Sequence, residues 1–170
     1  MPKYSLWLQP DHADHARLQA LIDALSARFD SPGFAAHMTL LSPVDGDDES
    51  LIPLLHTLAL QNRALIATPR AFEFKPVFYQ SCTLTLSATP DLSQLRQNAM
   101  QVFATKDKRA FEPHISLAYL TPQVAHRSEL APLLPDALLS TPIRLSRFTL
   151  MATEGGPMDW QEVLSVDAAI

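Results

Sequence analysis

His37-Met38-Thr39-Leu40 and His114-Ile115-Ser116-Leu117 are two copies of one pattern: a histidine, an apolar residue, a hydroxyl residue and a leucine. The two histidines are 77 positions apart, and each copy lies on a predicted strand that follows a predicted helix. Residues i and i+2 of a strand project from one face, so each hydroxyl lies beside its own histidine. A single copy would more often be a hydrogen-bonded surface pair. Two copies in corresponding places favour a catalytic constellation.

The segments around the motifs alternate between extended and helical patterns. The predicted strands are residues 4–8, 34–41, 64–74, 78–87, 111–120, 143–153 and 160–166. The predicted helices begin at Asp11, at the acidic run 47–50 and at Thr89-Pro90, and a proline-broken helical stretch covers residues 124–139. Gly33 suits the end of the first helix, and Pro53 is tolerated in the first turn of the second.

The repeated helix–strand order predicts a two-lobed α+β fold. Each lobe contributes one antiparallel sheet to a shared central cleft, with helices on the outer faces, and the two histidine strands meet near a pseudo-twofold axis. The 170 residues, 47% of them hydrophobic, suffice for one sizeable core. We therefore expect one domain spanning residues 1–170.

Composition and charge exclude several classes of protein. A net charge of -5 argues against a long nucleic acid as the main ligand, because such binding needs many Lys and Arg contacts. The single cysteine, Cys82, can form no internal disulfide and has no companion for a zinc or iron–sulfur site, so core packing is its expected role. No stretch is long and apolar enough for a signal peptide or a membrane span. We expect a soluble, cytoplasmic monomer.

The four motif side chains match the needs of cyclic phosphodiester hydrolysis. This reaction requires a base for water, an acid for the departing alkoxide and donors for the phosphate oxygens. Imidazole has an unperturbed pKa of about 6.5, so one neutral and one protonated histidine can coexist near neutral pH. His37 and His114 are thus the predicted acid and base, and Thr39 and Ser116 the phosphate ligands. No metal or other cofactor is expected, because neither motif has the third ligand or the spacing of a zinc signature.

Other polar and aromatic residues are weaker candidates. Trp7 and Tyr119 could stack on a nucleobase, but such residues are more often packing residues, and strict alternation places Tyr119 opposite His114 unless the strand ends or bulges. Arg109 could contact phosphate, although a solvated loop cation is the better interpretation. His12, His15 and His126 are expected on the surface.

At these residues the sequence resembles the two-histidine phosphoesterase superfamily, within it the cyclic phosphodiesterases. The resemblance also covers the segments 4–7, 34–39, 78–80, 89–90 and 111–119 and the late Trp160. It implies a bilobal fold and hydrolysis of ADP-ribose 1'',2''-cyclic phosphate or nucleoside 2',3'-cyclic phosphates to monophosphates. It also implies that Tyr119 joins the phosphate pocket and that Trp7 helps to position the base or ring of the substrate.

Two departures from the family pattern bear on the substrate. Ala36 precedes the first motif where many relatives have proline. Leu41-Ser42-Pro43 follows it, whereas the RNA 2',3'-cyclic phosphodiesterases, often called 2'-5' RNA ligases, tend to continue with Phe-Leu-Gly and carry more basic surface. An RNA-end enzyme is therefore the second hypothesis, and a non-catalytic nucleotide-binding module is the third.

Overall fold

The computed structural model describes residues 3–121 and 127–170. Its strands are β1 (Tyr4–Pro10), β2 (Met38–Val44), β3 (Leu65–Ala67), β4 (Pro69–Glu73), β5 (Cys82–Leu86), β6 (His114–Ala118), β7 (Ile143–Ala152) and β8 (Gln161–Asp167). Its α-helices are α1 (His12–Phe29), α2 (Asp48–Gln61), α3 (Pro90–Val102), α4 (Arg127–Leu130) and α5 (Ala137–Ser140), and its 3-10 turns are η1 (Phe78–Gln80), η2 (Ala131–Leu133) and η3 (Pro157–Asp159).

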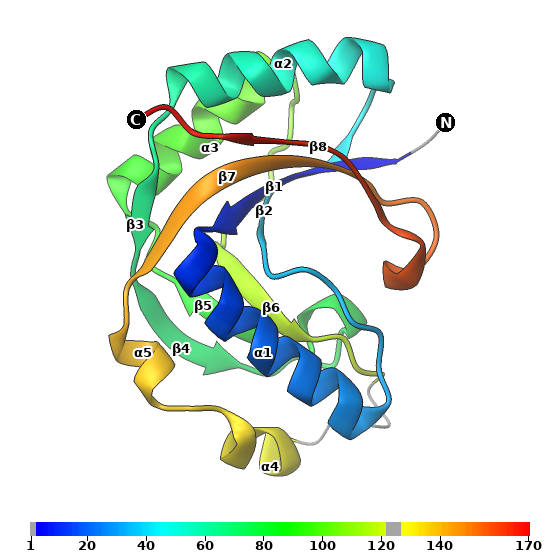
Figure 1. Ribbon diagram of the computed structural model, residues 1–170, viewed down its shortest axis with the longest axis vertical. Helices are drawn as coiled ribbons and strands as arrows, with labels where there is room; N and C mark the ends of the chain where they lie inside the picture. The colour runs from blue at the N-terminus through cyan, green and yellow to red at the C-terminus, as the bar shows by residue number, and fades with distance from the viewer. Residues whose placement is uncertain (1–2, 122–126) are drawn as a thin grey trace.

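The strands form one antiparallel sheet in the order β3-β7-β1-β2-β6-β5-β4, with β8 paired to β7 (Figure 1). The sequence predicted two separate sheets. They are instead the two halves of one sheet, because β2 and β6 are joined by a single registered pair, Met38 and Ile115. The first half contains β3, β7, β8, β1 and β2, and the second contains β6, β5 and β4.

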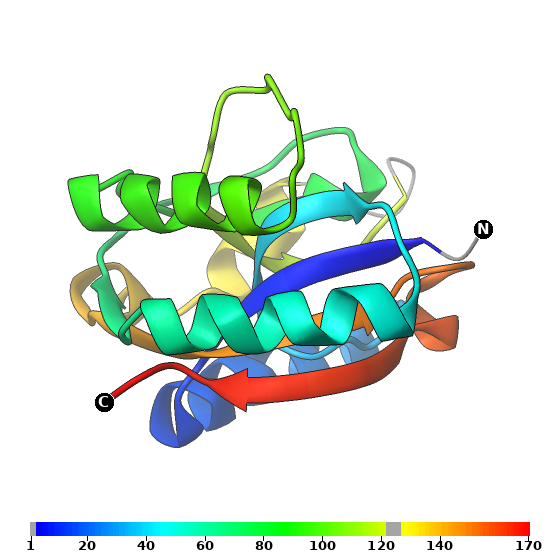
Figure 2. The same cartoon turned by 90° about the horizontal axis from the view of Figure 1, so that it is seen from above.

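The predicted pseudo-twofold repeat is visible in the order of the elements. In β1-α1-β2 and again in β5-α3-β6, two antiparallel neighbours are connected by a helix. Each helix contacts the histidine strand of the other unit: α1 packs on β6, and α3 packs on β2. Figure 1 shows α1 across the β5–β6 side, and Figure 2 shows α2 and α3 together over the other half. The two halves are therefore interlocked by their helices.

The three long helices begin where their capping residues predict. Asp11 accepts a hydrogen bond from the backbone of Asp14, Asp47 and Ser50 form a capping box, and Thr89 caps α3 ahead of Pro90. Helix α1 ends earlier than Gly33: Asp30 adopts a left-handed conformation with φ 50° and its backbone N–H bonds to the Ser26 carbonyl. Asp can occupy this region at modest cost, so no glycine is needed there.

The segment before the first histidine is not a strand, although the sequence predicted one over residues 34–41. Its backbone groups bond to side chains instead of to a neighbouring strand. Gln19 accepts from the Ala36 N–H at 2.8 Å and donates to the Phe34 carbonyl at 2.8 Å, while Gln9 donates to the Ala36 carbonyl at 3.2 Å. The strand begins only at Met38, one residue after His37.

Two other predicted segments are also divided. Residues 64–74 were predicted as one strand, but the chain changes partners at Thr68: β3 pairs with β7, and β4 pairs with β5. Pro69, which has no backbone N–H, begins the second piece. Residues 78–87 start with the turn η1 before β5. Of the predicted helical stretch 124–139, the first part lies outside the described residues, and the rest contains only short helical turns.

Candidate active site

The two histidine motifs meet where the halves of the sheet join. Met38 and Ile115 are paired across β2 and β6, and both are fully buried. Because these middle residues point into the core, the residues on either side of each point to the opposite face. In an antiparallel pair this places His37 opposite Ser116 and Thr39 opposite His114. All four side chains line one cavity of about 780 Å³.

Both imidazole rings are held in the same way. Nδ1 of His37 lies 2.6 Å from the Ala35 carbonyl oxygen, and Nδ1 of His114 lies 2.8 Å from the Glu112 carbonyl oxygen. A carbonyl can only accept, so Nδ1 carries the proton in each ring. In the neutral form Nε2 then has a free lone pair, and in the charged form it carries a second proton. Each ring can therefore give or take a proton at Nε2.

The surroundings of His37 favour its neutral form. Burial lowers the pKa of His37 to about 4, the hydrogen bond to Ala35 opposes this shift, and the charge of His114 adds to it. A charged imidazole loses its hydration when it is buried, which is why the uncharged ring is preferred. His114 is only half-buried. The repeat thus places two chemically equivalent rings in unequal surroundings.

Trp7 lies against His37. The two rings are stacked with centroids 3.5 Å apart and an angle of 8° between their planes. Trp7 is a buried residue of β1 and also meets Trp160 edge-on at 5.7 Å. That Trp7 helps to position the base or ring of the substrate remains a prediction, whereas the structure places its indole directly against His37.

Tyr119 joins the cavity because β6 ends at Ala118, so the alternation that would turn Tyr119 away from His114 stops before it. Burial raises the pKa of the Tyr119 hydroxyl above its usual range, and a hydrogen bond with Ser116 partly offsets this. The hydroxyl is protonated at neutral pH and can donate to an anion. Tyr119 therefore lies in the cavity beside Ser116 with a protonated hydroxyl.

An aromatic slot, formed by Tyr79, Tyr119 and Trp160, lies next to these donors. The Tyr79 and Trp160 rings are nearly parallel, with a 19° angle and centroids 6.0 Å apart, and Tyr119 stands at 77° and 72° to them. Ser116 Oγ donates to the backbone carbonyl of Tyr79 at 3.1 Å, which ties the slot to the second motif. Sequence reasoning assigned no site role to Tyr79 or Trp160, because their own segments carry no motif.

The sequence also did not indicate that a cluster of charged side chains lies at the rim of the cavity. Arg96, Asp107 and Arg109 line the cavity together, although Arg109 was interpreted as a solvated loop cation. Its side chain is 69% exposed, but it bonds to Asp107 and to the carbonyl of Ser42.

Two other candidate histidines lie away from the cavity. His12 is exposed and His15 is half-buried, and neither lines the cavity. His126 lies outside the described residues. Within residues 3–121 and 127–170, no group of three or more His, Cys, Asp or Glu side chains is placed to hold a metal ion.

A family model for "Cyclic phosphodiesterase-like protein" matches residues 1–167 of this chain. The chain belongs to this family. As a cyclic phosphodiesterase-like protein it falls within the two-histidine phosphoesterase superfamily that its motifs predicted, and it is a cyclic phosphodiesterase enzyme.

Individual relatives agree with this assignment. A cyclic phosphodiesterase of Arabidopsis thaliana is 26% identical over 154 residues, which are 89% of this chain and 85% of the relative. Among solved structures, one named as a phosphoesterase covers 100% of both chains with a TM-score of 0.65 and 15% identity. E. coli LigT complexed with 3'-AMP covers 99% of both with a TM-score of 0.62 and 15% identity. The structural matches confirm the predicted fold class.

None of the helices in the described part of the chain has the length and apolarity needed to cross a membrane.

Proposed function

We propose that this cyclic phosphodiesterase hydrolyses the cyclic phosphate of a ribose, in a nucleoside 2',3'-cyclic phosphate or in ADP-ribose 1'',2''-cyclic phosphate, to a monophosphate. The observation that carries the proposal is the pairing of Met38 with Ile115. It brings two imidazole rings and two hydroxyls into one cavity, and each ring has Nδ1 bonded to a carbonyl and Nε2 left for chemistry.

His37 is the general base of the proposed reaction. Its pKa of about 4 keeps it neutral at pH 7, so Nε2 can take a proton from water as the water oxygen attacks phosphorus. His114, in its charged form, gives the Nε2 proton to the ribose oxygen as the bond between that oxygen and phosphorus breaks. The products are a phosphate monoester and a ribose hydroxyl, and solvent exchange restores the two protonation states.

Thr39, Ser116 and Tyr119 stabilise the phosphate. Their hydroxyls line the cavity beside the two rings. Thr39 and Tyr119 can donate to the non-bridging oxygens, whose negative charge the site must stabilise, and Ser116 can do so once its hydroxyl turns away from the Tyr79 carbonyl. The Arabidopsis relative is named for the same reaction class, and E. coli LigT has been solved with 3'-AMP and with phosphate. The aromatic slot provides ring faces for the base of such a nucleotide.

The decisive experiment is hydrolysis by the purified protein in excess EDTA. The substrates are adenosine 2',3'-cyclic phosphate, ADP-ribose 1'',2''-cyclic phosphate and a short RNA that ends in a cyclic phosphate. We expect turnover of at least one of the two small substrates, undiminished by EDTA. Turnover of RNA alone would favour an RNA-end enzyme, loss of activity in EDTA would contradict the two-histidine mechanism, and binding without turnover would contradict catalysis.

A further inference from the structure

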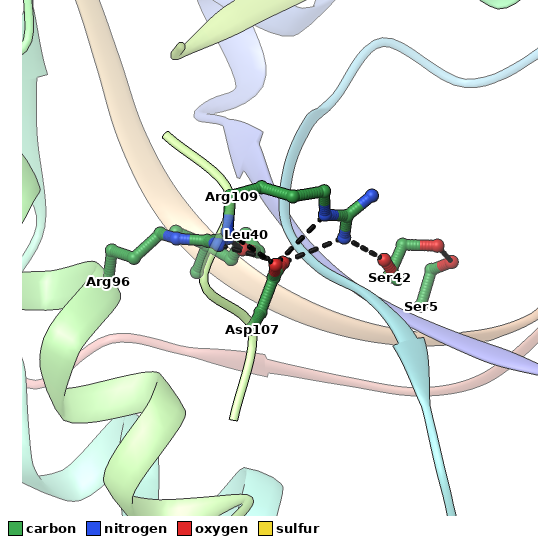
Figure 3. A network of polar contacts seen from close by, with 6 residues as sticks. All are labelled: Ser5, Leu40, Ser42, Arg96, Asp107 and Arg109. Atoms are coloured by element: carbon green, nitrogen blue, oxygen red, sulfur yellow. Dashed lines mark hydrogen bonds and ion pairs between the residues drawn. The ribbon is translucent and has the colours of Figure 1, made fainter. Parts of the chain in front are cut away.

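A cationic cluster of Arg96, Asp107 and Arg109 lies at the rim of the catalytic cavity (Figure 3). Asp107 Oδ2 lies 2.9 Å from an Arg96 nitrogen and 2.7 Å from an Arg109 nitrogen. These bonds hold the pKa of Asp107 well below its usual range, chiefly through Arg109. Two guanidinium groups share one carboxylate, so the cluster keeps one unbalanced positive charge in a protein whose net charge is -5.

Arg109 is held in one orientation despite its exposure. Nε bonds to Asp107 Oδ1 at 2.9 Å, and Nη2 bonds to Asp107 Oδ2 at 2.7 Å and to the Ser42 carbonyl at 2.6 Å. The hydrogen bonds found among the described residues use only these two guanidinium nitrogens. Figure 3 shows the third nitrogen pointing away from Asp107. An exposed arginine fixed in this way loses little side-chain entropy when it binds an anion.

Asp107 is itself anchored to the catalytic strand. Arg96 is buried, and it donates both to Asp107 and to the carbonyl of Leu40, the residue after Thr39. Arg109 contacts the carbonyl of Ser42, three residues after Thr39. At the usual rise of a strand, Ser42 and Thr39 are about 10 Å apart. The cluster therefore lies along the same cavity wall as the phosphate site, displaced from it by a few residues.

We propose that Arg109 binds a second phosphate group of the substrate, carried on the 5-oxygen of the ribose whose cyclic phosphate is cleaved. This inference rests on the proposed function. One sugar ring separates the two phosphates in such a substrate, and ADP-ribose 1'',2''-cyclic phosphate has this arrangement. An RNA end presents the same chemistry as a phosphodiester, but the net charge of -5 favours the small nucleotide. Arg109 is thus a specificity-determining residue for this enzyme.

The test compares substrates that differ by one phosphate: adenosine 2',3'-cyclic phosphate and its 5'-phosphorylated form, with ADP-ribose 1'',2''-cyclic phosphate as a third. For Arg109→Gln we expect kcat/KM on the two 5-phosphorylated substrates to fall on the order of ten- to a hundredfold more than on the unphosphorylated one, the range of a charged hydrogen bond. Arg109→Lys should recover part of this difference. Lys108→Gln is the control, because Lys108 is an exposed cation of the same loop that does not line the cavity.

Two results would overturn the inference. An equal loss on all three substrates, with a lowered Tm, would show that Arg109 only ties the loop to β2. A preference confined to a short RNA with a cyclic end would assign the second phosphate to RNA. If the wild-type protein hydrolyses none of the substrates, the proposed function itself fails, which is distinct from a wild type that is active but whose substrate preference does not depend on Arg109.

Discussion

His37 combines a buried ring with a single backbone partner, and this sets the pH at which it can act. Its pKa of about 4 lies below the ordinary value of 6.5 because burial penalises the charged ring. We predict that kcat/KM falls as pH is lowered through about 4, where Nε2 becomes protonated. Because the unfolded chain takes up this proton near 6.5, the contribution of His37 to stability is also lost as pH falls from 6.5 through 4.

A pH profile of kcat/KM, taken with Tm measured at each pH, checks this prediction. The melting data show whether loss of activity at low pH reflects acid unfolding. An acidic limb centred near 6.5 in a fully folded protein would mean that His37 is not the base.

Removal of either imidazole should lower the rate of hydrolysis strongly. For His37→Ala and His114→Ala we expect kcat to fall on the order of 10² to 10⁴, because each variant loses one proton transfer. Thr39→Ala and Ser116→Ala serve as comparisons and should lose less, since each removes one of several donors to the phosphate. Turnover that survives unchanged in either histidine variant would remove that residue from the mechanism.

The indole of Trp7 covers one face of the His37 ring. We predict that Trp7→Leu lowers kcat and shifts the acidic limb of the kcat/KM–pH profile to higher pH. A less covered imidazole is better hydrated, so its charged form is less strongly disfavoured. Trp7→Phe keeps an aromatic face and should restore most of the rate and the original limb. If KM rises while the limb stays in place in both variants, Trp7 instead contacts the substrate.

At the scale of elements, the chain from Phe34 to Ala36 depends on Gln19 of α1. This side chain pairs with two backbone groups immediately before His37. Gln19→Leu should leave both groups without partners, lower the free energy of unfolding by about 1–3 kcal/mol and reduce kcat. Gln94→Leu is the matched control, because the Gln94 side chain bonds to Asn98 on the exposed side of α3 and to no other side chain in the described part of the protein. Equal effects of the two substitutions would contradict this role of Gln19.

Elements with local signals could be predicted from the sequence, and those that depend on distant partners could not. The caps Asp11, Asp47 and Thr89 act within their own first turn, so the starts of the three long helices were predictable. The division of residues 64–74 depends on two different partners, β7 and β5, which lie elsewhere in the chain. The late start of β2 depends on Gln9 and Gln19 in the same way.

At the scale of the whole molecule, the two histidine motifs meet only through the contact between the halves of the sheet. Met38 is fully buried at this junction. We expect Met38→Ala to cost about 2–5 kcal/mol of stability and also to lower kcat, because the cavity lets the two motifs shift against each other. Leu58→Ala in α2, equally buried but away from the motifs, should cost similar stability with little change in kcat. The prediction fails if kcat in the two variants is the same.

The site itself was only partly predictable. His37, Thr39, His114 and Ser116 form a repeat that can be recognised in one dimension, and the structure brings all four to one cavity. Tyr79, Trp160 and the Arg96–Asp107–Arg109 cluster come from separate segments that meet only in the folded chain. No spacing rule connects them, because the sheet topology alone determines that they are neighbours.

The crossed placement of α1 and α3 has a consequence for how the protein forms. Helix α1 packs on β6, about a hundred residues later, and β1 pairs along its whole length with β7. Such distant partners give a high contact order and slow folding. The helix of each unit, α1 or α3, packs on the histidine strand of the other unit, so the two units depend on each other to complete their packing. During synthesis, the cavity can therefore be completed only after β7 and Trp160, which lines it, have left the ribosome.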